Sequence, residues 1–563
     1  MNLIKNQIVE AEITDLNILG MGVAKFDGAV LFVQNGVIGD IAKLKVIKCA
    51  KNYYVCRIEE MISASPYRVE PKCSHFRKCG GCSFWHVKYD LEREIKEKYV
   101  ASCLKKEGLG DIQVSKLIAT NCTENYRNKA QFPVGKDENG RVVSGFYSNR
   151  SHKLCPIDRC LIQDYDFAEI SEFLCGFMSE NKIEPYSEES KKGLVRHIYL
   201  RSAKSTGEIS LCLVLSEKHF PHSEELVRRI NARFPNVVSI SINVQPKHNN
   251  VILGKENVLL YGKEKIDDVL CDRRFSISPM SFYQVNHDGA ELLYRTAFQM
   301  ADLSGYDLIV DLYCGIGSIS ISSHSSCPIL GVEIVPEAVR DAKVNANNNG
   351  IENAEFICGD ASKAFAEIET QQAKNPLVIV DPPRKGLTSE LIREIAATRI
   401  DHVLYISCNA ETLARDLSIF REVGFDTDSV QPVDMFPRTS HVETVALLSR
   451  QIDVHKMKLN SAPFEMIKSG VKTIELRLFD EKRQQLKVGD KIVFTDTTTG
   501  ETLNTTIVKL HRFDSFEELY KSLPLLKCGY TTENVDNANS SDMEEYYSVE
   551  EQKKYGVAGI EFC

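Results

Sequence analysis

Long hydrophobic runs are missing from this sequence of 563 residues. No stretch of about 18 consecutive apolar residues occurs, which excludes a membrane-spanning helix. Residues 1–7 also lack the apolar core of a secretory signal, so we expect a cytoplasmic protein with no membrane partner. In that reducing compartment, the 18 cysteines are expected to be free thiols or metal ligands rather than disulfides.

An overall positive charge is missing as well, because the net charge is -9. The charge is unevenly distributed, however. Residues 1–160 carry 25 Lys and Arg against 18 Asp and Glu, whereas residues 161–450 carry 29 against 41 and residues 451–563 carry 15 against 19. This asymmetry fits a basic N-terminal part that meets phosphate groups, and it fits ordinary drift in composition equally well.

The hydrophobic content of 43% is sufficient for folded cores, and the pattern along the chain predicts an α/β and β multidomain protein without internal repeats. Short strands with glycine turns predict a small β-barrel over residues 1–62. A central α+β region is expected over 63–275. Apolar strands alternating with helices predict a parallel α/β sheet of Rossmann type over 276–450. A further domain with one mobile acidic loop, at 533–545, is expected over 454–563.

Three cysteines lie within ten residues near the N-terminus. Cys73, Cys79 and Cys82 have the spacing Cys-x5-Cys-x2-Cys, with two glycines inside. Cys160 is a candidate for a fourth ligand, and Cys155 is its near competitor. This spacing favours a metal site over incidental thiols, but it does not decide between zinc and an iron–sulfur cluster.

A glycine loop follows the strand that ends at Asp311. Gly315 and Gly317 form Gly-x-Gly without the third glycine of the dinucleotide fingerprint, and Glu333 ends the next strand, where an acid can bind ribose hydroxyls. Asp381 ends a third strand and precedes two prolines, which would hold its carboxylate at the same edge. The pattern predicts a nucleoside-type cofactor.

A thiol and a carboxylate follow in the same region. Cys408 lies between a strand and a helix, and a helix N-terminus lowers the pKa of a thiol and activates it as a nucleophile. Glu443 precedes an apolar strand and suits a general base if it is desolvated. From the spacing alone, a buried structural cysteine and a surface glutamate fit the pattern equally well.

Together these motifs resemble the S-adenosylmethionine-dependent RNA (uracil-5-)-methyltransferases that act on 23S rRNA and carry a TRAM domain. The resemblance covers residues 1–450 almost continuously. It is carried by the glycine turns of the barrel, the cysteine cluster and three further motifs, which are Phe282-Tyr283-Gln284-Val285-Asn286, Ser407-Cys408-Asn409 and His441-Val442-Glu443-Thr444.

The resemblance implies that Cys408 attacks carbon 6 of uracil and that Glu443 removes the proton from carbon 5. It implies a [4Fe-4S] cluster on Cys73, Cys79, Cys82 and Cys160. It also implies that S-adenosylmethionine is bound by Gln284, Tyr313, Glu333, Asp360 and Asp381. Tyr313, Ser318 and Asp360 differ from the residues of some members, which we expect to change hydrogen bonding and not the reaction. Phosphate contacts by Arg127, Lys129 and Arg384, and stacking on Phe132, are weaker expectations, since surface charges and a core phenylalanine fit equally well.

Residues 470–477 resemble the Gly-x-Lys-x-x-Glu-x-Arg signature of ASCH domains, small β-barrels proposed to bind RNA. Lys472, Glu475 and Arg477 would then line a polar cleft or form a structural ion-pair network. The expected function is methylation of uracil in 23S rRNA or a pre-ribosomal particle by a monomer. The alternatives are methylation of tRNA and a non-catalytic iron–sulfur RNA-binding factor.

Overall fold

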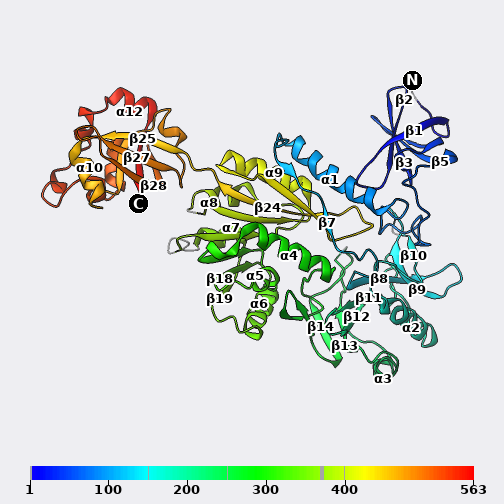
Figure 1. The fold of residues 1–563 in the computed structure, drawn as a ribbon. Helices are drawn as coiled ribbons and strands as arrows, with labels where there is room; N and C mark the ends of the chain where they lie inside the picture. Colours follow the sequence, from blue (N-terminus) through cyan, green and yellow to red (C-terminus); the bar gives the residue numbers. More distant parts are fainter. Residues whose placement is uncertain (1–2, 150, 152, 250, 368–372, 399) are drawn as a thin grey trace.

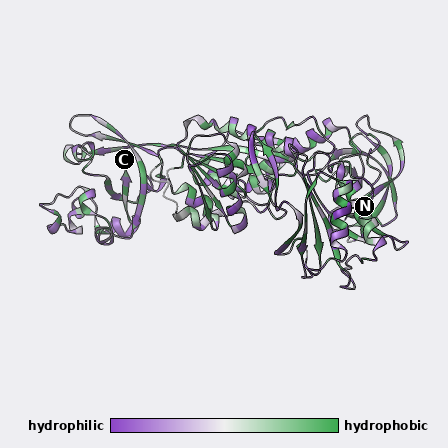
Figure 2. Cartoon of the chain, turned by 90° about the horizontal axis from the view of Figure 1, so that it is seen from below, coloured by the Kyte–Doolittle hydropathy of each residue, from purple (hydrophilic) through white to green (hydrophobic). Residues whose placement is uncertain are grey.

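The computed structural model describes residues 3–149, 151, 153–249, 251–367, 373–398 and 400–563. The chain is elongated, with the N-terminal barrel and the C-terminal domain at opposite ends (Figures 1 and 2). No helix in the described ranges is long and apolar enough to cross a membrane.

Five N-terminal strands close into the predicted barrel, in the order β1-β2-β3-β5-β4. Alternate residues point inward, so that Ile13, Ala24 and Leu44 are fully buried in its centre. The barrel strands are β1 (Ile8–Leu16), β2 (Gly22–Phe26), β3 (Ala29–Gln34), β4 (Ile41–Cys49) and β5 (Tyr54–Ser63).

The central region is built on a seven-stranded sheet, in the order β10-β9-β8-β11-β12-β13-β14. Helices α2 (Asp166–Glu180) and α3 (Ser223–Arg233) pack against it. The strands are β8 (Lys129–Lys136), β9 (Val142–Tyr147), β10 (Leu154–Pro156), β11 (Val195–Ser202), β12 (Ile209–Leu215), β13 (Val237–Val244) and β14 (Glu256–Gly262). A hairpin of β15 (Ile266–Leu270) and β16 (Arg273–Ile277) follows.

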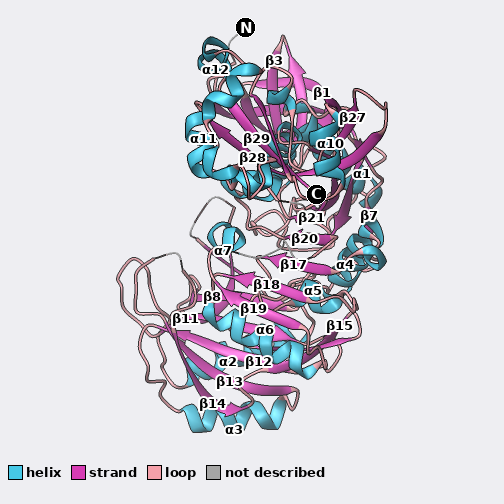
Figure 3. Cartoon of the chain, turned by 90° about the vertical axis from the view of Figure 1, so that its left-hand side faces the viewer, coloured by secondary structure: helices cyan, strands magenta, loops and turns pink. Residues whose placement is uncertain are grey.

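The predicted parallel sheet is present, with its strands in the order β19-β18-β17-β20-β21 (Figure 3). Antiparallel β24 pairs with β21, and β23 pairs with the other edge of β24. Two short strands from the central region, β6 (Gln113–Val114) and β7 (Ile118–Ala119), extend this sheet by pairing with β23. This sheet therefore takes in two short strands from before residue 275. The other strands are β17 (Leu308–Leu312), β18 (Ile329–Glu333), β19 (Ala354–Cys358), β20 (Pro376–Val380), β21 (His402–Ser407), β22 (Phe425–Asp426), β23 (Ser429–Asp434) and β24 (Glu443–Arg450).

Helices cover both faces of this sheet, which explains why its strands are apolar throughout. Val310 and Val378 face one core, whereas their neighbours Ile309 and Leu377 face the other. The helices are α1 (Tyr89–Lys106), α4 (His287–Ala301), α5 (Ser318–Ser322), α6 (Pro336–Asn348), α7 (Ala361–Glu367), α8 (Ser389–Ala396) and α9 (Ala410–Glu422).

The C-terminal domain is an open five-stranded sheet in the order β25-β27-β28-β29-β26, and not the closed barrel that the resemblance implied. The acidic segment expected to be a mobile loop forms two short 3-10 helices, and Met543 packs against the domain core. The elements are β25 (Val454–Leu459), α10 (Ser461–Lys468), β26 (Ile474–Leu478), β27 (Lys491–Asp496), β28 (Thr502–Phe513), α11 (Phe516–Ser522), α12 (Val549–Tyr555) and β29 (Val557–Phe562).

Arg450, at the end of β24, joins the C-terminal domain to the parallel sheet. Its buried guanidinium donates to the carbonyls of Ala396, Thr398 and Ile400 on one side. It donates to the carbonyl of Val488 on the other, at 2.9 Å. A planar group with five donors can hold two domains in one orientation in this way.

A fully buried ion cluster ties α1 to the segment that leads into β24. Lys96 Nζ lies 2.8 Å from Glu92 Oε1 and 2.8 Å from Asp434 Oδ1, and all three side chains are inaccessible to solvent. Lys96 also donates to the carbonyl of Phe436. The cluster therefore fixes the chain shortly before Glu443.

Replacing Lys96 by methionine should lower the free energy of unfolding by about 3–5 kcal/mol, because the buried Asp434 loses its cation. Among the described residues, Glu92 keeps only the more distant Arg438 as a cation, at 3.6 Å. Urea unfolding measures the change. Lys98→Met on the exposed face of the same helix is the matched control and should be close to wild type. A Lys96→Met protein as stable as wild type would contradict the assigned role of the cluster.

Candidate active site

The predicted site residues gather at one edge of the parallel sheet. Glu333 ends β18, Asp381 follows β20 and Cys408 follows β21. Tyr313 follows β17, and Asp360 lies two residues after β19. The carboxyl ends of parallel strands share an edge, and open α/β sheets bind ligands there.

The loop after β17 has the backbone of a binding loop. Tyr313, Gly315 and Gly317 all have positive φ, and a Cβ on Gly317 would lie 2.8 Å from Ile321. Glu333 accepts hydrogen bonds from the backbone N–H groups of Gly315 and Val335. The carboxylate thus holds the loop in place next to the strand end.

A buried carboxylate lies under this loop. Asp311 is fully buried, and its Oδ1 has no hydrogen-bond partner among the described residues. Burial raises the pKa of Asp311 to about 7. An unpaired buried acceptor next to a glycine loop fits a ligand that brings a donor, such as the amino group of S-adenosylmethionine.

Gln284 and Asp360 make contacts within the fold. Gln284 is buried just before α4, and its backbone carbonyl accepts from the side chain of Asn128. The Asp360 carboxylate accepts from the backbone N–H groups of Ser362 and Lys363 and so supports the start of α7.

Cys408 and Glu443 lie next to each other because β21 and β24 are antiparallel neighbours. Ser407 pairs with Thr444 in their register, which places the residue after one opposite the residue before the other. Cys408 lines a pocket of about 220 Å³ together with Arg384, Asn409 and His441. A donor of Arg384 lies 3.3 Å from Nε2 of His441.

The pKa of Cys408 shifts in the direction opposite to the sequence prediction. Burial raises it to about 11, and the carboxylates of Glu443 and Asp381 add to the shift. These effects outweigh the charge of Arg384, which lowers the pKa. A thiol with a raised pKa needs a base nearby when a substrate arrives.

Two carboxylates near the thiol are shifted as well. Burial raises the pKa of Glu443 to about 8, with a contribution from the charge of Asp381. Burial raises the pKa of Asp381 to about 7, with a contribution from Asp311. Acids shifted towards neutral pH by desolvation in a pocket are suited to proton transfer.

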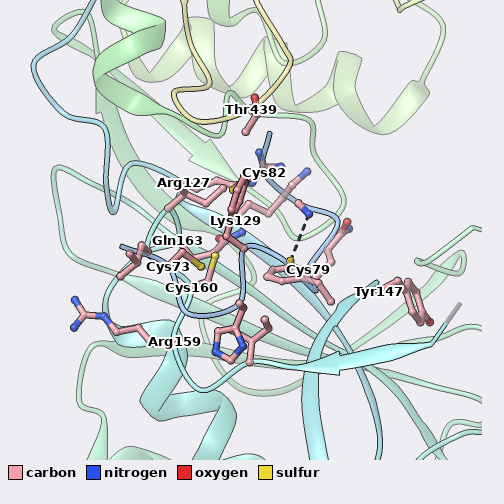
Figure 4. Close-up of a pocket in the computed structure, with 18 of the residues that line it drawn as sticks. Cys73, Cys79, Cys82, Arg127, Lys129, Tyr147, Arg159, Cys160, Gln163 and Thr439 are labelled. Carbon is pink, nitrogen blue, oxygen red and sulfur yellow. Dashed lines mark hydrogen bonds between the residues drawn. The ribbon is translucent and has the colours of Figure 1, made fainter. Parts of the chain in front are cut away.

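The four predicted cluster ligands line one cavity of about 370 Å³ (Figure 4). Cys160 is among the residues that line it, and Cys155 is not. Burial raises the pKa of Cys73, Cys79, Cys82 and Cys160, and for Cys79 and Cys82 neighbouring thiolates add to the shift. Four thiols sharing one cavity are a suitable donor set for an iron–sulfur cluster.

The structure does not show the predicted metal site. Among the described residues, no three His, Cys, Asp or Glu side chains are close enough to hold one metal ion.

The weaker expectations about RNA contacts have different outcomes. Phe132 is buried in the core of the central sheet against Phe146, so the expected stacking on RNA is wrong. Arg127 and Lys129 line the cysteine cavity, and Arg384 lines the pocket of Cys408. Burial lowers the pKa of Lys129 to about 8, and the nearby Arg201 and Arg127 lower it further.

The signature of the C-terminal domain satisfies both alternatives that the sequence left open. Lys472 Nζ and Arg477 Nε each lie 2.8 Å from a carboxylate oxygen of Glu475, which forms an ion-pair network. The same three residues line a cavity of about 490 Å³. The network is therefore part of the cavity wall.

The sequence reasoning missed one part of the site. Ile18 and Leu19 of the N-terminal barrel and Tyr99 of α1 also line the pocket of Cys408. In the sequence, the only local feature at this part of the site is a leucine next to the glycine turn at Gly20. Leu19 is half-exposed in the structure.

Comparison with known proteins gives three family matches. Residues 88–451 match the tRNA (uracil-5-)-methyltransferase family, residues 4–54 match the TRAM domain and residues 457–563 match the ASCH domain. An uncharacterized RNA methyltransferase of Halalkalibacterium halodurans is 43% identical over 446 residues, which cover 79% of this chain and 97% of that protein. One of Clostridium acetobutylicum is 40% identical over 450 residues, covering 79% and 98%.

A solved structure is similar over the same part of the chain. It is the Pyrococcus abyssi tRNA (uracil-54, C5)-methyltransferase in complex with S-adenosyl-L-homocysteine. The TM-score is 0.63 at 27% sequence identity, and the match covers 78% of this chain and 99% of that one.

Proposed function

The chain belongs to the tRNA (uracil-5-)-methyltransferase family, whose members methylate uracil in RNA with S-adenosylmethionine, and on this premise we propose that it methylates carbon 5 of uracil in 23S rRNA. The observation that carries the reaction is the placement of Cys408 beside Glu443 at the carboxyl edge of the sheet. The preference for 23S rRNA rests on the resemblance of the TRAM barrel and cysteine cluster.

The chemistry explains the pair of side chains. Carbon 5 of uracil is a weak nucleophile, and addition of the Cys408 sulfur to carbon 6 converts the ring to an enolate that is reactive at carbon 5. S-adenosylmethionine, when bound, supplies an electrophilic methyl group. The Glu443 carboxylate then removes the proton from carbon 5, and elimination breaks the sulfur–carbon bond and frees Cys408.

The elevated pKa values divide the tasks between these residues. Cys408 must lose its proton before it attacks, and with a pKa of about 11 it needs a neighbouring carboxylate as acceptor. Glu443 and Asp381 are the carboxylates that raise its pKa. Glu443 must stay deprotonated to take the proton from carbon 5, so Asp381 is the candidate for the thiol proton. The uracil must leave the base stack to reach this pocket.

The cofactor residues are proposed from their positions at the same edge. Gln284, Tyr313, Glu333 and Asp381, with Asp360 beside them, would hold S-adenosylmethionine. The support for this is the loop organised by Glu333 and the unpaired buried oxygen of Asp311.

tRNA is the second candidate substrate, because the family and the Pyrococcus abyssi relative are named for tRNA. The deciding experiment incubates unmodified 23S rRNA and tRNA transcripts separately with the protein and S-adenosylmethionine. Nucleoside-resolved mass spectrometry should show 5-methyluridine in 23S rRNA. A gain only in tRNA would keep the reaction and overturn the substrate.

The cysteine cavity is proposed to hold a [4Fe-4S] cluster on Cys73, Cys79, Cys82 and Cys160. Its distance in sequence from Cys408 favours a role in folding over a role in the reaction. The cavity also presents Arg127 and Lys129, which suit phosphate contacts at its mouth.

Protein purified without oxygen should contain about four iron atoms per chain. Cys160→Ser should lose most of the iron, whereas the matched control Cys155→Ser should keep it. Iron and sulfide analysis measures both. Iron-free wild type, or equal loss in the two variants, would contradict the ligand set.

A further inference from the structure

The pocket of Cys408 is not complete within the methyltransferase-like domain. Its wall includes Ile18 and Leu19, which belong to the loop between β1 and β2 of the N-terminal barrel. Leu19 and Cys408 are nearly 390 positions apart in the sequence. The barrel therefore contributes directly to the space in which the thiol reacts.

The loop that carries Leu19 is held tightly. The side chain of Asn17 accepts hydrogen bonds from the backbone N–H groups of Leu19 and Met21, both at 3.0 Å. Gly20 has a φ of +73°, and a Cβ at this position would lie 2.1 Å from the carbonyl oxygen of Ser83. Only glycine fits this close approach.

The segment under the loop is itself tied to the active-site strand. The backbone N–H groups of Ser83 and Phe84 both donate to the carbonyl of Arg438, five residues before Glu443. Leu16, at the end of β1, packs with Phe84 in one buried cluster. The position of the loop relative to the site is therefore fixed by packing and by hydrogen bonds.

Leu19 is nevertheless 55% exposed. Single exposed leucines are common and need no explanation by themselves. Leu19 differs because its backbone is fixed and its side chain lines the pocket of the thiol. Covering this fixed apolar side chain with a ligand removes it from water, which favours binding.

We propose that Leu19 is a substrate-positioning residue, whose side chain packs against the nucleotide that enters the pocket. An extruded base loses its stacking partners, and apolar contacts in the pocket replace part of that interaction. Leu19 would thus hold the pyrimidine ring in reach of the Cys408 sulfur. The inference rests on the proposed function, in which an RNA uracil is the group that reacts.

The test compares Leu19→Ser and Leu19→Met with Ile62→Ser. Ile62 is 46% exposed on β5 of the same barrel and does not line the pocket, so it controls for loss of surface apolar area. For a 23S rRNA transcript, Leu19→Ser should lower kcat/KM about tenfold, the loss expected when one apolar contact is removed. Leu19→Met should restore most of it, because volume is conserved.

The affinity for S-adenosylmethionine and the unfolding midpoint should be unchanged in all three variants. A loss in Leu19→Ser that is matched by Ile62→Ser, or no loss in either, would overturn the proposal.

A second readout does not depend on turnover. A transcript that contains 4-thiouridine is irradiated with the wild-type protein, and the crosslinked peptide is identified by mass spectrometry. A crosslink to the peptide that contains Leu19 supports the proposal, even if the protein transfers no methyl group, in which case the proposed function alone fails. Methyl transfer without this crosslink, and without an effect of Leu19→Ser, overturns the positioning role alone.

Discussion

Replacement of Cys408 by alanine is expected to abolish methylation, with a loss of at least about 10⁴-fold in turnover. The reason is that carbon 5 of uracil becomes reactive only after sulfur has added to carbon 6. The affinity for S-adenosylmethionine should stay near wild type, because the glycine loop that is proposed to bind the cofactor is held by Glu333 and not by the thiol. Calorimetry and incorporation of a labelled methyl group measure the two quantities.

Cys49→Ala is the matched control, since Cys49 is an exposed thiol on the barrel. This variant should methylate RNA at the wild-type rate. Turnover by Cys408→Ala close to wild type would overturn the covalent mechanism.

Replacement of Glu443 by glutamine should stop the reaction after the Cys408 sulfur has added to carbon 6. The protein should then stay covalently bound to its RNA. Glutamine keeps the shape of the side chain but cannot accept the proton from carbon 5, so the sulfur–carbon bond is not released. Turnover should fall by about 10²–10⁴-fold. A covalent protein–RNA adduct that contains Cys408 should accumulate and migrate as one species on denaturing gels.

Glu422→Gln is the control, because Glu422 is exposed at the end of α9 and does not line the pocket of Cys408. It should turn over normally and form no lasting adduct. If Glu443→Gln also leaves no adduct while its turnover is lost, Glu443 acts before the addition step and not as the base at carbon 5.

The pH dependence of the wild-type enzyme should reflect the same residue. Burial raises the pKa of Glu443 to about 8, so its protonated form dominates below that value and the carboxylate dominates above it. A base is active as the carboxylate, and the Cys408 thiol also loses its proton more readily at high pH. The rate should therefore rise with pH through about 8, and this rise should be absent from any residual activity of Glu443→Gln.

The sequence was sufficient for the family and for the order of its domains along the chain. Alternating apolar strands and helices identified the parallel sheet, and residues such as Asp311, Glu333 and Cys408 lie at the ends of its strands. Strand ends meet at one edge in every fold of this kind, so the linear pattern already implied that these side chains converge. TRAM, methyltransferase and ASCH matches confirm the predicted family.

Contacts between distant segments decided the rest. The sequence placed Cys408 at a helix N-terminus and so predicted a lowered pKa, but burial and the carboxylates of Glu443 and Asp381 raise it. The choice of Cys160 over Cys155 depends on which thiol faces the cavity. Strands β6 and β7 pair with β23, which lies more than 300 residues farther along the chain. No local pattern could therefore assign them to that sheet.

Local patterns report which residues share a helix face or a strand end, because their period is fixed by backbone geometry. By itself, this sequence therefore determined the elements, the family and the candidate nucleophile and base. Tertiary structure decided the direction in which the pKa of the thiol shifts, the cysteines that share a cavity and the presence of Leu19 beside Cys408. Desolvation, neighbouring charges and pocket walls arise from packing between segments that no local pattern connects.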